Sequence, residues 1–259
     1  MTKKQINPNL KKLAEMTCNP GLKMPDLEEQ IEEEMQDLQF PVKNLQDYIR
    51  VAGTGYVIAK AQTDNGLKYE PTHLQVLQRG LEIPTPALFT THLLNVIKAK
   101  KGKLRLYDGL GQVLGNSEVE QIYNGLTSDC WTWLNAGFKK VRDGEGYQAF
   151  DLERVVGLDS KGDLVKQTAP LEQCLMEDCF INLNENQFNN QGLATKKSSA
   201  RGHQQGKVIK FWHPRNNRVT GFGANSDRAY LYCVRDPDYS NDSLVYGAFA
   251  KQTRCNEIF

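Results

Sequence analysis

The clearest helical pattern in the chain lies between residues 85 and 101. Thr85 can cap a helix that begins at Pro86, because its oxygen accepts a free backbone N–H and proline suits the first helical position. Residues suited to a buried face recur at helical spacing: Leu88, Phe89, His92, Leu93, Val96 and Ile97. A second helix is predicted over 70–80, ending at Gly80. The acidic run LEEQIEEEMQDL, which begins at Leu27, predicts a third.

From about residue 104 onward the pattern changes to short alternating runs broken by turn residues, which predicts β-strands. DSKGD at 159–163 predicts a hairpin turn. Near the C-terminus we expect strands over 218–224 and 229–235, joined through the turn residues 225–228, and a third strand over 244–250. Because helices come first and strands later, the predicted fold class is α+β.

The hairpin predicted over 218–235 should have two different faces, because side chains alternate along a strand. Its expected scaffold positions are apolar or small: Val219, Phe222, Ala224, Ala229, Leu231 and Cys233. The other set, on the strands and the adjoining turns, is rich in Tyr, Asn, Asp and Gly. That chemistry is typical of antibody binding sites, where Tyr gives contact area at low entropic cost and small polar residues adapt.

The segment from His213 to Ala250 contains no Lys, Glu, Gln, Met or Trp. These five types make up 63 of the 259 residues, so a window of 38 residues would hold about nine at the same frequency. The genetic code offers a reason. An Asn codon AAY whose two adenines are randomised becomes NNY, and NNY encodes none of these five types. The composition therefore indicates adenine-directed mutagenesis.

Two segments carry a resemblance to a known family. GLEIPTPALF at 80–89 is similar to the helix start shared by lectin folds of the formylglycine-generating-enzyme type, with Glu82 and Leu88 departing from its basic and acidic positions. The stretch from FWHPRNNRV through ANSDRAYLYCVRDPDYSNDSL resembles a variable region. Over about 80–250 the chain resembles the variable proteins of diversity-generating retroelements, in particular those of archaea and their viruses.

The resemblance implies an α+β C-type lectin fold with short twisted antiparallel sheets and two helices. It says little about 1–70, for which the residue pattern predicts a mainly helical N-terminal extension. The domains would be a helical segment over 1–70, for assembly or attachment, and a lectin domain over 71–259 with its variable region at about 213–250. The mechanism would be display, with a fixed scaffold and exchangeable ligand contacts. Carried over position by position, those contacts are Gly221, Gly223, Asn225, Asp227, Arg228, Tyr230, Tyr232, Val234, Asp236, Asp238, Tyr239, Asn241, Asp242, Val245 and Tyr246.

Charge and composition restrict the partners. The net charge of +1 gives no electrostatic case for nucleic acid or an anionic membrane. No apolar run predicts membrane insertion, and the basic N-terminus lacks the apolar core of a signal peptide. We therefore expect a protein or other macromolecular ligand at the variable face, no cofactor and no metal. The location stays open between the cytoplasm and a virus particle.

Two other functions remain open. A formylglycine-generating-type oxidase would need a reactive cysteine pair, for which Cys233 and Cys255 are the candidates, although the alternation predicts a buried Cys233. A carbohydrate-binding or viral tail-tip lectin would share the fold without any adenine bias. Acidic turns at 143–146 and 159–163 suggest calcium by analogy with lectins, but turn propensity explains them more simply.

Overall fold

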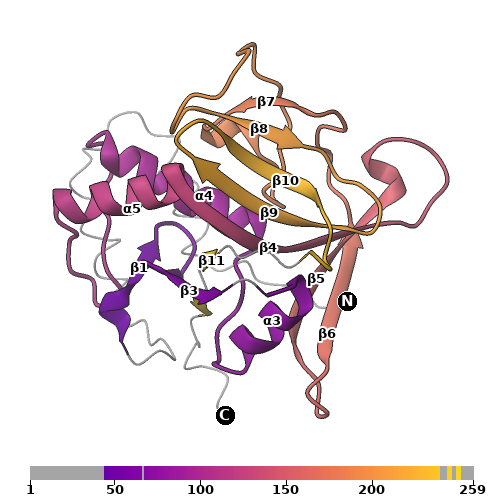
Figure 1. Ribbon diagram of the computed structural model, residues 1–259, viewed down its shortest axis with the longest axis horizontal. Coiled ribbons are helices and arrows are strands. Elements are labelled where there is room, and N and C mark those ends of the chain that lie inside the picture. The colour runs from indigo at the N-terminus through magenta and orange to yellow at the C-terminus, as the bar shows by residue number, and fades with distance from the viewer. Residues whose placement is uncertain (1–43, 66, 240–243, 247–248, 252–259) are drawn as a thin grey trace, which may run out of the picture. The chain divides into compact units, whose positions relative to one another are not determined.

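The computed structural model describes residues 44–65, 67–239, 244–246 and 249–251. The chain divides into two compact units, residues 1–39 and 40–259, and all described residues belong to the second. This unit is an α+β structure with a large sheet of seven strands (Figure 1). The α+β class was predicted, although three short strands precede the helices. The helix expected from Leu27 onward lies outside the described residues.

Two of the predicted helices are confirmed. Helix α4 spans Pro86–Lys100, and Thr85 caps it by accepting the N–H of Leu88 at 3.3 Å. All six residues of its expected apolar face are buried. Helix α3 spans Tyr69–Leu77 and is followed by Gly80, whose φ of +72° is a conformation that favours glycine.

Helix α5, Asn116–Ser128, was not predicted, because strands were expected from residue 104 onward. Val119, Ile122 and Leu126 are buried at helical spacing and would have indicated it. The start signal is weak, because Gly115 occupies the N-cap position without a side chain that could cap the helix. The chain therefore enters α5 without the usual sequence marker.

The strand order of the large sheet is β6-β5-β4-β9-β10-β8-β7. Neighbours pair antiparallel except β10 and β8, which run parallel, so the sheet is mixed rather than purely antiparallel. The predicted turn at 159–163 joins β5 to β6. The strands are β4 Asp129–Lys140, β5 Phe150–Leu158, β6 Leu164–Pro170, β7 Cys179–Asn182, β8 Val208–Trp212, β9 Arg218–Asn225 and β10 Ala229–Arg235; short 3-10 helices lie at Leu45–Asp47, Tyr147–Ala149 and Glu185–Gln187.

Two predictions about the ends of this unit differ from the structure. The described part of the expected helical segment contains β1 Tyr48–Val51, β2 Tyr56–Ala59 and β3 Gln62–Asn65, and the first two contribute to the same core as α4. The boundary placed at 70/71 therefore falls inside the compact unit. The single strand expected over 244–250 is instead β11 Leu244–Tyr246, which pairs with β3, and β12 Phe249–Lys251, which pairs with β2.

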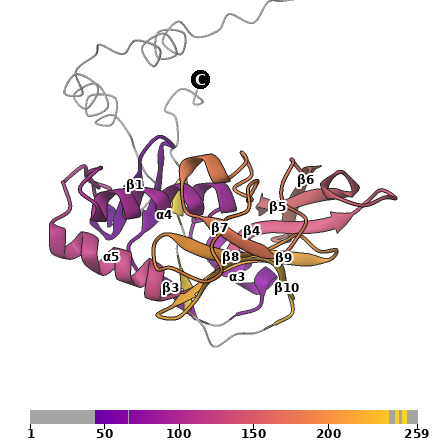
Figure 2. The same cartoon turned by 90° about the horizontal axis from the view of Figure 1, so that it is seen from above.

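Apolar side chains form two buried clusters, one on each face of the large sheet. The main cluster joins α4 and α5 to the sheet, and the ring centroids of Phe89 and Phe222 are 4.9 Å apart. The second cluster contains Trp133, Val219 and Tyr69 of α3. Trp133 belongs to the second cluster and Leu134 to the first, because successive side chains of β4 point to opposite faces. Figure 2 shows α4 on one side of the strands and α3 on the other.

Candidate functional site

Strands β9 and β10 form the hairpin that the alternation predicted. They pair antiparallel from Ala224 opposite Ala229 to Gly221 opposite Tyr232. Asn225 shapes the turn, since its side-chain oxygen accepts the N–H groups of Asp227 and Arg228, each at 3.0 Å. Asn225 was expected to be a ligand contact, but its side chain is occupied within the turn.

The expected scaffold positions are all buried. The residues that face α4 and α5 are Phe222, Ala224, Ala229, Leu231 and Cys233, all members of the main cluster. Val219 is buried too, but in the second cluster on the opposite face of β9. The alternation therefore predicted burial correctly at each position, although it did not separate the two faces for Val219.

The outer face of the hairpin is aromatic on β10 and glycine on β9. Tyr230 and Tyr232 are partly exposed, with ring centroids 5.1 Å apart. Gly221 and Gly223 are buried, because neighbouring side chains lie over them. Trp131 of β4 lies against Gly223 and stacks on Tyr232, with ring centroids 6.2 Å apart. The two glycines were expected to contact ligand, but as they stand they provide room for Trp131 and Arg235.

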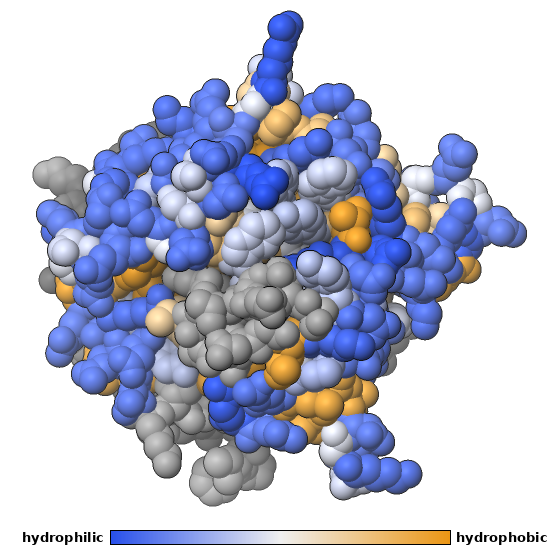
Figure 3. All heavy atoms as spheres, viewed as in Figure 1, coloured by the Kyte–Doolittle hydropathy of each residue, from blue (hydrophilic) through white to orange (hydrophobic). Residues whose placement is uncertain are grey.

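Cross-strand register arranges the outer face in two rows. One row runs Trp131, Gly223, Tyr230, Lys210 and Phe180 across β4, β9, β10, β8 and β7. The next row runs Trp133, Gly221, Tyr232 and Trp212. Most of these side chains lie outside the window 213–250, so residues from inside and outside the window share one face of the sheet. In Figure 3, pale spheres of intermediate hydropathy gather over the area where Figure 1 draws β9 and β10.

Three cations lie over the rings of this face. The Lys210 Nζ is 4.5 Å from the Trp212 ring centroid, and the Arg228 guanidinium is 5.8 Å from that of Tyr230. The Arg235 guanidinium is 4.2 Å from the Trp133 centroid, and burial lowers the pKa of Arg235. Such contacts are worth about 0.5–2 kcal/mol, more where the pair is shielded from water. They hold the long side chains in defined positions.

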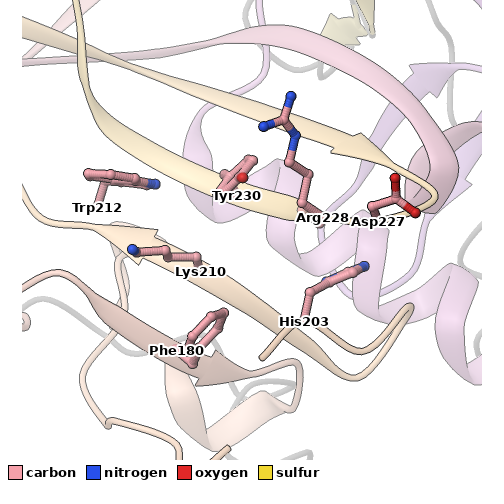
Figure 4. A pocket seen from close by; sticks show the side chains of 8 residues that line it. Phe180, His203, Lys210, Trp212, Asp227, Arg228 and Tyr230 are labelled. Atoms are coloured by element: carbon pink, nitrogen blue, oxygen red, sulfur yellow. The ribbon is translucent and has the colours of Figure 1, made fainter. Parts of the chain in front are cut away.

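A pocket of about 380 Å³ opens between the ends of β7, β8 and the turn that joins β9 to β10. Figure 4 shows Tyr230 between Trp212 and Arg228, with the Lys210 amine directed toward Trp212. Asp227 and Arg228 are exposed on this turn, as expected for contact positions. The lining residues are Phe180, His203, Lys210, Trp212, Asp227, Arg228, Ala229 and Tyr230.

The loop that follows β10 carries the next expected contacts. Asp236 pairs with Arg218 and accepts the N–H of Asp238 at 3.0 Å, which orders this loop. Tyr239 is 56% exposed, and Asp238 is exposed beside Lys68. Of the remaining contacts, Val234 is partly exposed, Asn241 and Asp242 lie outside the described residues, and Val245 and Tyr246 lie in β11.

Sequence reasoning missed the residues of this face that lie outside the window: Phe180, His203, Lys210 and Trp212 around the pocket, and Trp131 and the buried Trp133 on β4. A signal existed in the period-two spacing of Trp131 and Trp133, and of Lys210 and Trp212. It could not show that these pairs flank the window strands, because strand order is a tertiary property.

The described cysteine and the acidic turn that were candidates for chemistry have structural roles. Cys233 is fully buried, and burial raises the pKa of its thiol; Cys255 lies outside the described residues. Asp159 accepts the N–H groups of Lys161 and Asp163, which closes the predicted hairpin turn. No group of His, Cys, Asp or Glu suited to a metal ion occurs among the described residues. Nor does any helix in those ranges combine the length and apolar character needed to span a membrane.

Comparison of the chain with protein-family models, curated proteins and solved structures found no match. The fold class therefore rests on the structure alone.

Proposed function

We propose that this chain is a non-enzymatic ligand-binding protein with a C-type lectin fold, whose outer face over β9 and β10 is diversified by adenine-directed mutagenesis. One observation carries the proposal. In β10, Ala229, Leu231 and Cys233 are buried against the main core, whereas Tyr230 and Tyr232 reach the surface. Positions needed for packing thus alternate with positions free to change.

The side chains that reach the surface support this division. Tyr, Arg, Asp and Asn can all arise from an AAY codon, and Tyr and Arg are among the most frequent energetic anchors of protein interfaces. The exposed positions of the window include Arg215, Asn216, Asp227, Arg228 and Tyr239. Lys, Glu and Gln, which favour such exposed positions, are absent from 213–250. A packing requirement does not explain their absence there, since solvent accepts all three.

The scaffold can tolerate exchange at these positions. Surface substitutions away from special features usually change stability by no more than about 0.5 kcal/mol. The packing beneath is independent of them, because α4 and α5 contact the opposite face of the sheet. Two helices on one face of a sheet are in keeping with the proposed C-type lectin fold. The buried Cys233 thiol, with its raised pKa, argues against the oxidase alternative.

The DNA around the gene provides the test. We expect a near-copy of the segment encoding about 213–250, with adenines wherever the two differ, and a reverse transcriptase gene beside it. The same sequence would identify an archaeal or archaeal-virus source. A locus with neither element would refute diversification and leave a lectin-like binding protein, whose sugar binding would then be measured with a glycan array.

A laboratory library tests the display mechanism separately. Codons for the exposed window positions Arg215, Asn216, Ser226, Asp227, Arg228 and Tyr239 are replaced by NNY, and folded variants are selected for binding to a chosen soluble protein. A matched library randomises Phe222, Ala224, Leu231 and Cys233 in the same way. Display predicts mostly folded members and new binders from the first library and few folded members from the second.

A further inference from the structure

Lys210 differs from the ion-paired lysines of the described chain. Lys60, Lys98 and Lys166, for example, each pair with a carboxylate. The Lys210 side chain is partly buried and forms no ion pair with a described residue; its Nζ lies 4.5 Å from the Trp212 centroid and 6.0 Å from that of Phe180. A cation held between aromatic rings in a pocket keeps its charge available to a ligand.

The pocket around Lys210 carries an excess of positive charge. Arg228 is the second cation of its lining and also forms no ion pair with a described residue; it lies over Tyr230. Asp227 is the single carboxylate of the lining, and it is exposed at the rim beside the hydroxyl of Ser226. His203 faces the pocket as well, with its Nδ1 donating to the carbonyl of Val208 at 2.8 Å. Two cations against one carboxylate favour an anionic ligand.

Two shielded polar atoms of the pocket lining have no partner among the described residues. They are Nε1 of Trp212, which is a hydrogen-bond donor, and Nε2 of His203, which is an acceptor in a neutral ring whose Nδ1 donates to Val208. Leaving a buried donor unpaired is unfavourable, and an acceptor brought by a ligand would remove that penalty. The donors and cations of Trp212, Lys210 and Arg228 all suit the oxygen atoms of a carboxylate.

We infer that this pocket binds a carboxylate presented by an acidic segment of a protein ligand, with an apolar or aromatic group of the ligand close to that carboxylate. The inference rests on the proposed function and specifies the ligand of the same face. A volume of about 380 Å³ suits one side chain rather than a folded segment. A protein is favoured over an acidic sugar because the aromatic rows continue beyond the pocket, and because Tyr, Trp and Arg are typical anchors of protein interfaces.

The pocket also combines a constant wall with a variable one. Phe180, His203, Lys210 and Trp212 precede the window, whereas Asp227, Arg228 and Tyr230 lie inside it. Variants with a different window would keep the cation and the two aromatic rings. The constant wall would then select a carboxylate in every variant, and the variable wall would select what surrounds it.

The three tryptophans of the chain provide a direct readout, because each gives one indole N–H signal in a ¹⁵N-correlated NMR spectrum. The full chain is titrated with N-acetyl-L-phenylalanine and, separately, with its uncharged amide. The Trp212 signal is identified by its loss in Trp212→Phe. We expect the acid to shift that signal saturably and the amide to bind about tenfold more weakly, as for loss of a charge-assisted contact.

Lys210→Gln and Lys207→Gln form a matched pair, since Lys207 is an exposed lysine just before β8. We expect Lys210→Gln to weaken acid binding about tenfold and Lys207→Gln to leave it unchanged. Equal binding of acid and amide, or equal effects of the two substitutions, would overturn the proposal. If Lys210→Gln changes the whole spectrum, its fold is altered, and the comparison of acid with amide in the parent chain then tests the carboxylate site.

Two further ligands show whether the carboxylate comes from a protein or from a sugar. Other outcomes distinguish failure of the carboxylate site from failure of the proposed function. N-acetyl-L-glutamic acid α-amide represents an acidic side chain, and D-glucuronate represents an acidic sugar. Binding of glucuronate alone would overturn the acidic protein segment. A selected protein ligand that needs Tyr230 and Tyr232, while no acid shifts the Trp212 signal, would refute the carboxylate site and leave the proposed function. A locus without a template copy would refute diversification and leave acid binding intact.

Discussion

The indole ring of Trp131 lies directly against the backbone of Gly223 on the neighbouring strand. A Cβ atom at Gly223 would be 2.5 Å from two carbons of that ring, closer than real contacts allow. Trp131 therefore occupies the space that a side chain at this position would need. The same ring stacks on Tyr232, so the position of Trp131 links β4 to the exposed tyrosines of β10.

The contact between Trp131 and Gly223 predicts the cost of a small substitution. Gly223→Ala should displace the indole and destabilise the chain by about 1–3 kcal/mol, as overpacking usually does. Gly202→Ala is the control, since a Cβ at Gly202 would meet nothing within 4 Å. Urea unfolding and tryptophan fluorescence measure both effects. Equal stability of the two variants would contradict the close contact.

The same contact predicts which window positions stay constant. We expect copies of the gene with different windows to keep glycine at 221 and 223 while residues 227, 228, 230 and 232 differ. Gly221 is expected to behave like Gly223, because a Cβ there would be 3.0 Å from the Arg235 side chain and from the carbonyl of Thr132. Sequencing several copies tests this. Bulky residues at 223 beside an unchanged Trp131 would contradict the expectation.

Phe222 should be a scaffold residue, because its ring packs against Phe89 inside the main cluster. Phe222→Ala should lower the free energy of unfolding by about 3–5 kcal/mol. Phe222→Asp should prevent folding by burying an unpaired charge. Ser226→Asp, in the exposed turn, is the control and should change stability by no more than about 0.5 kcal/mol. Circular dichroism and urea unfolding report the outcomes.

Replacing Tyr230, Tyr232 and Tyr239 together by Ala should leave the fold intact and remove binding of a ligand selected against the parent chain. The expected loss of stability is about 1–3 kcal/mol, from ring contacts at the surface. Binding is measured by titration calorimetry and folding by circular dichroism. An unfolded triple variant would contradict the division into scaffold and display positions.

Asp178 holds the start of the window, since it accepts the ring Nδ1–H of His213 at 2.6 Å and pairs with Arg215 at 2.9 Å. Partial burial tends to raise the pKa of Asp178, but the hydrogen bonds from His213 and the charge of Arg215 outweigh it and lower that pKa. A lowered folded-state pKa stabilises above the unfolded value of about 4, and this stabilisation is lost as the pH falls through the folded pKa.

The corresponding experiment compares Asp178→Asn with the parent chain in urea at several pH values. We expect the parent to be more stable at pH 6, and the difference to shrink below about pH 4 as Asp178 is protonated. Asp143→Asn, at an exposed residue that forms no ion pair with a described residue, is the control. A difference that is constant with pH would show that the effect is not electrostatic.

The described cysteines should resist modification in the folded chain. Cys130, Cys174, Cys179 and Cys233 are buried, and burial raises the pKa of each thiol. In a variant with Cys18 and Cys255 replaced by Ser, we expect no rapid reaction with a thiol reagent until urea unfolds the chain. Rapid labelling of Cys233 in this variant would favour an oxidase with a reactive cysteine.

Local sequence determined much of the scaffold. Thr85 and Pro86 predicted the start of α4, and alternation predicted the β9–β10 hairpin with its buried positions, because caps and strand faces depend on nearby residues alone. The amino-acid composition of 213–250 led to the proposal of diversification, because the absence of five residue types is a feature of the sequence that the fold does not require.

The tertiary structure decided what surrounds the positions proposed to vary. Trp131 and Lys210 are far from Tyr230 in sequence but lie beside it, because the strand order places β9 and β10 between β4 and β8. That order results from how apolar faces pack together, so the alternation of residues within one strand does not predict it. The same order explains why Gly221 and Gly223, which were expected to contact ligand, are buried. The side chains of Arg235 and Trp131 on the neighbouring strands lie over them.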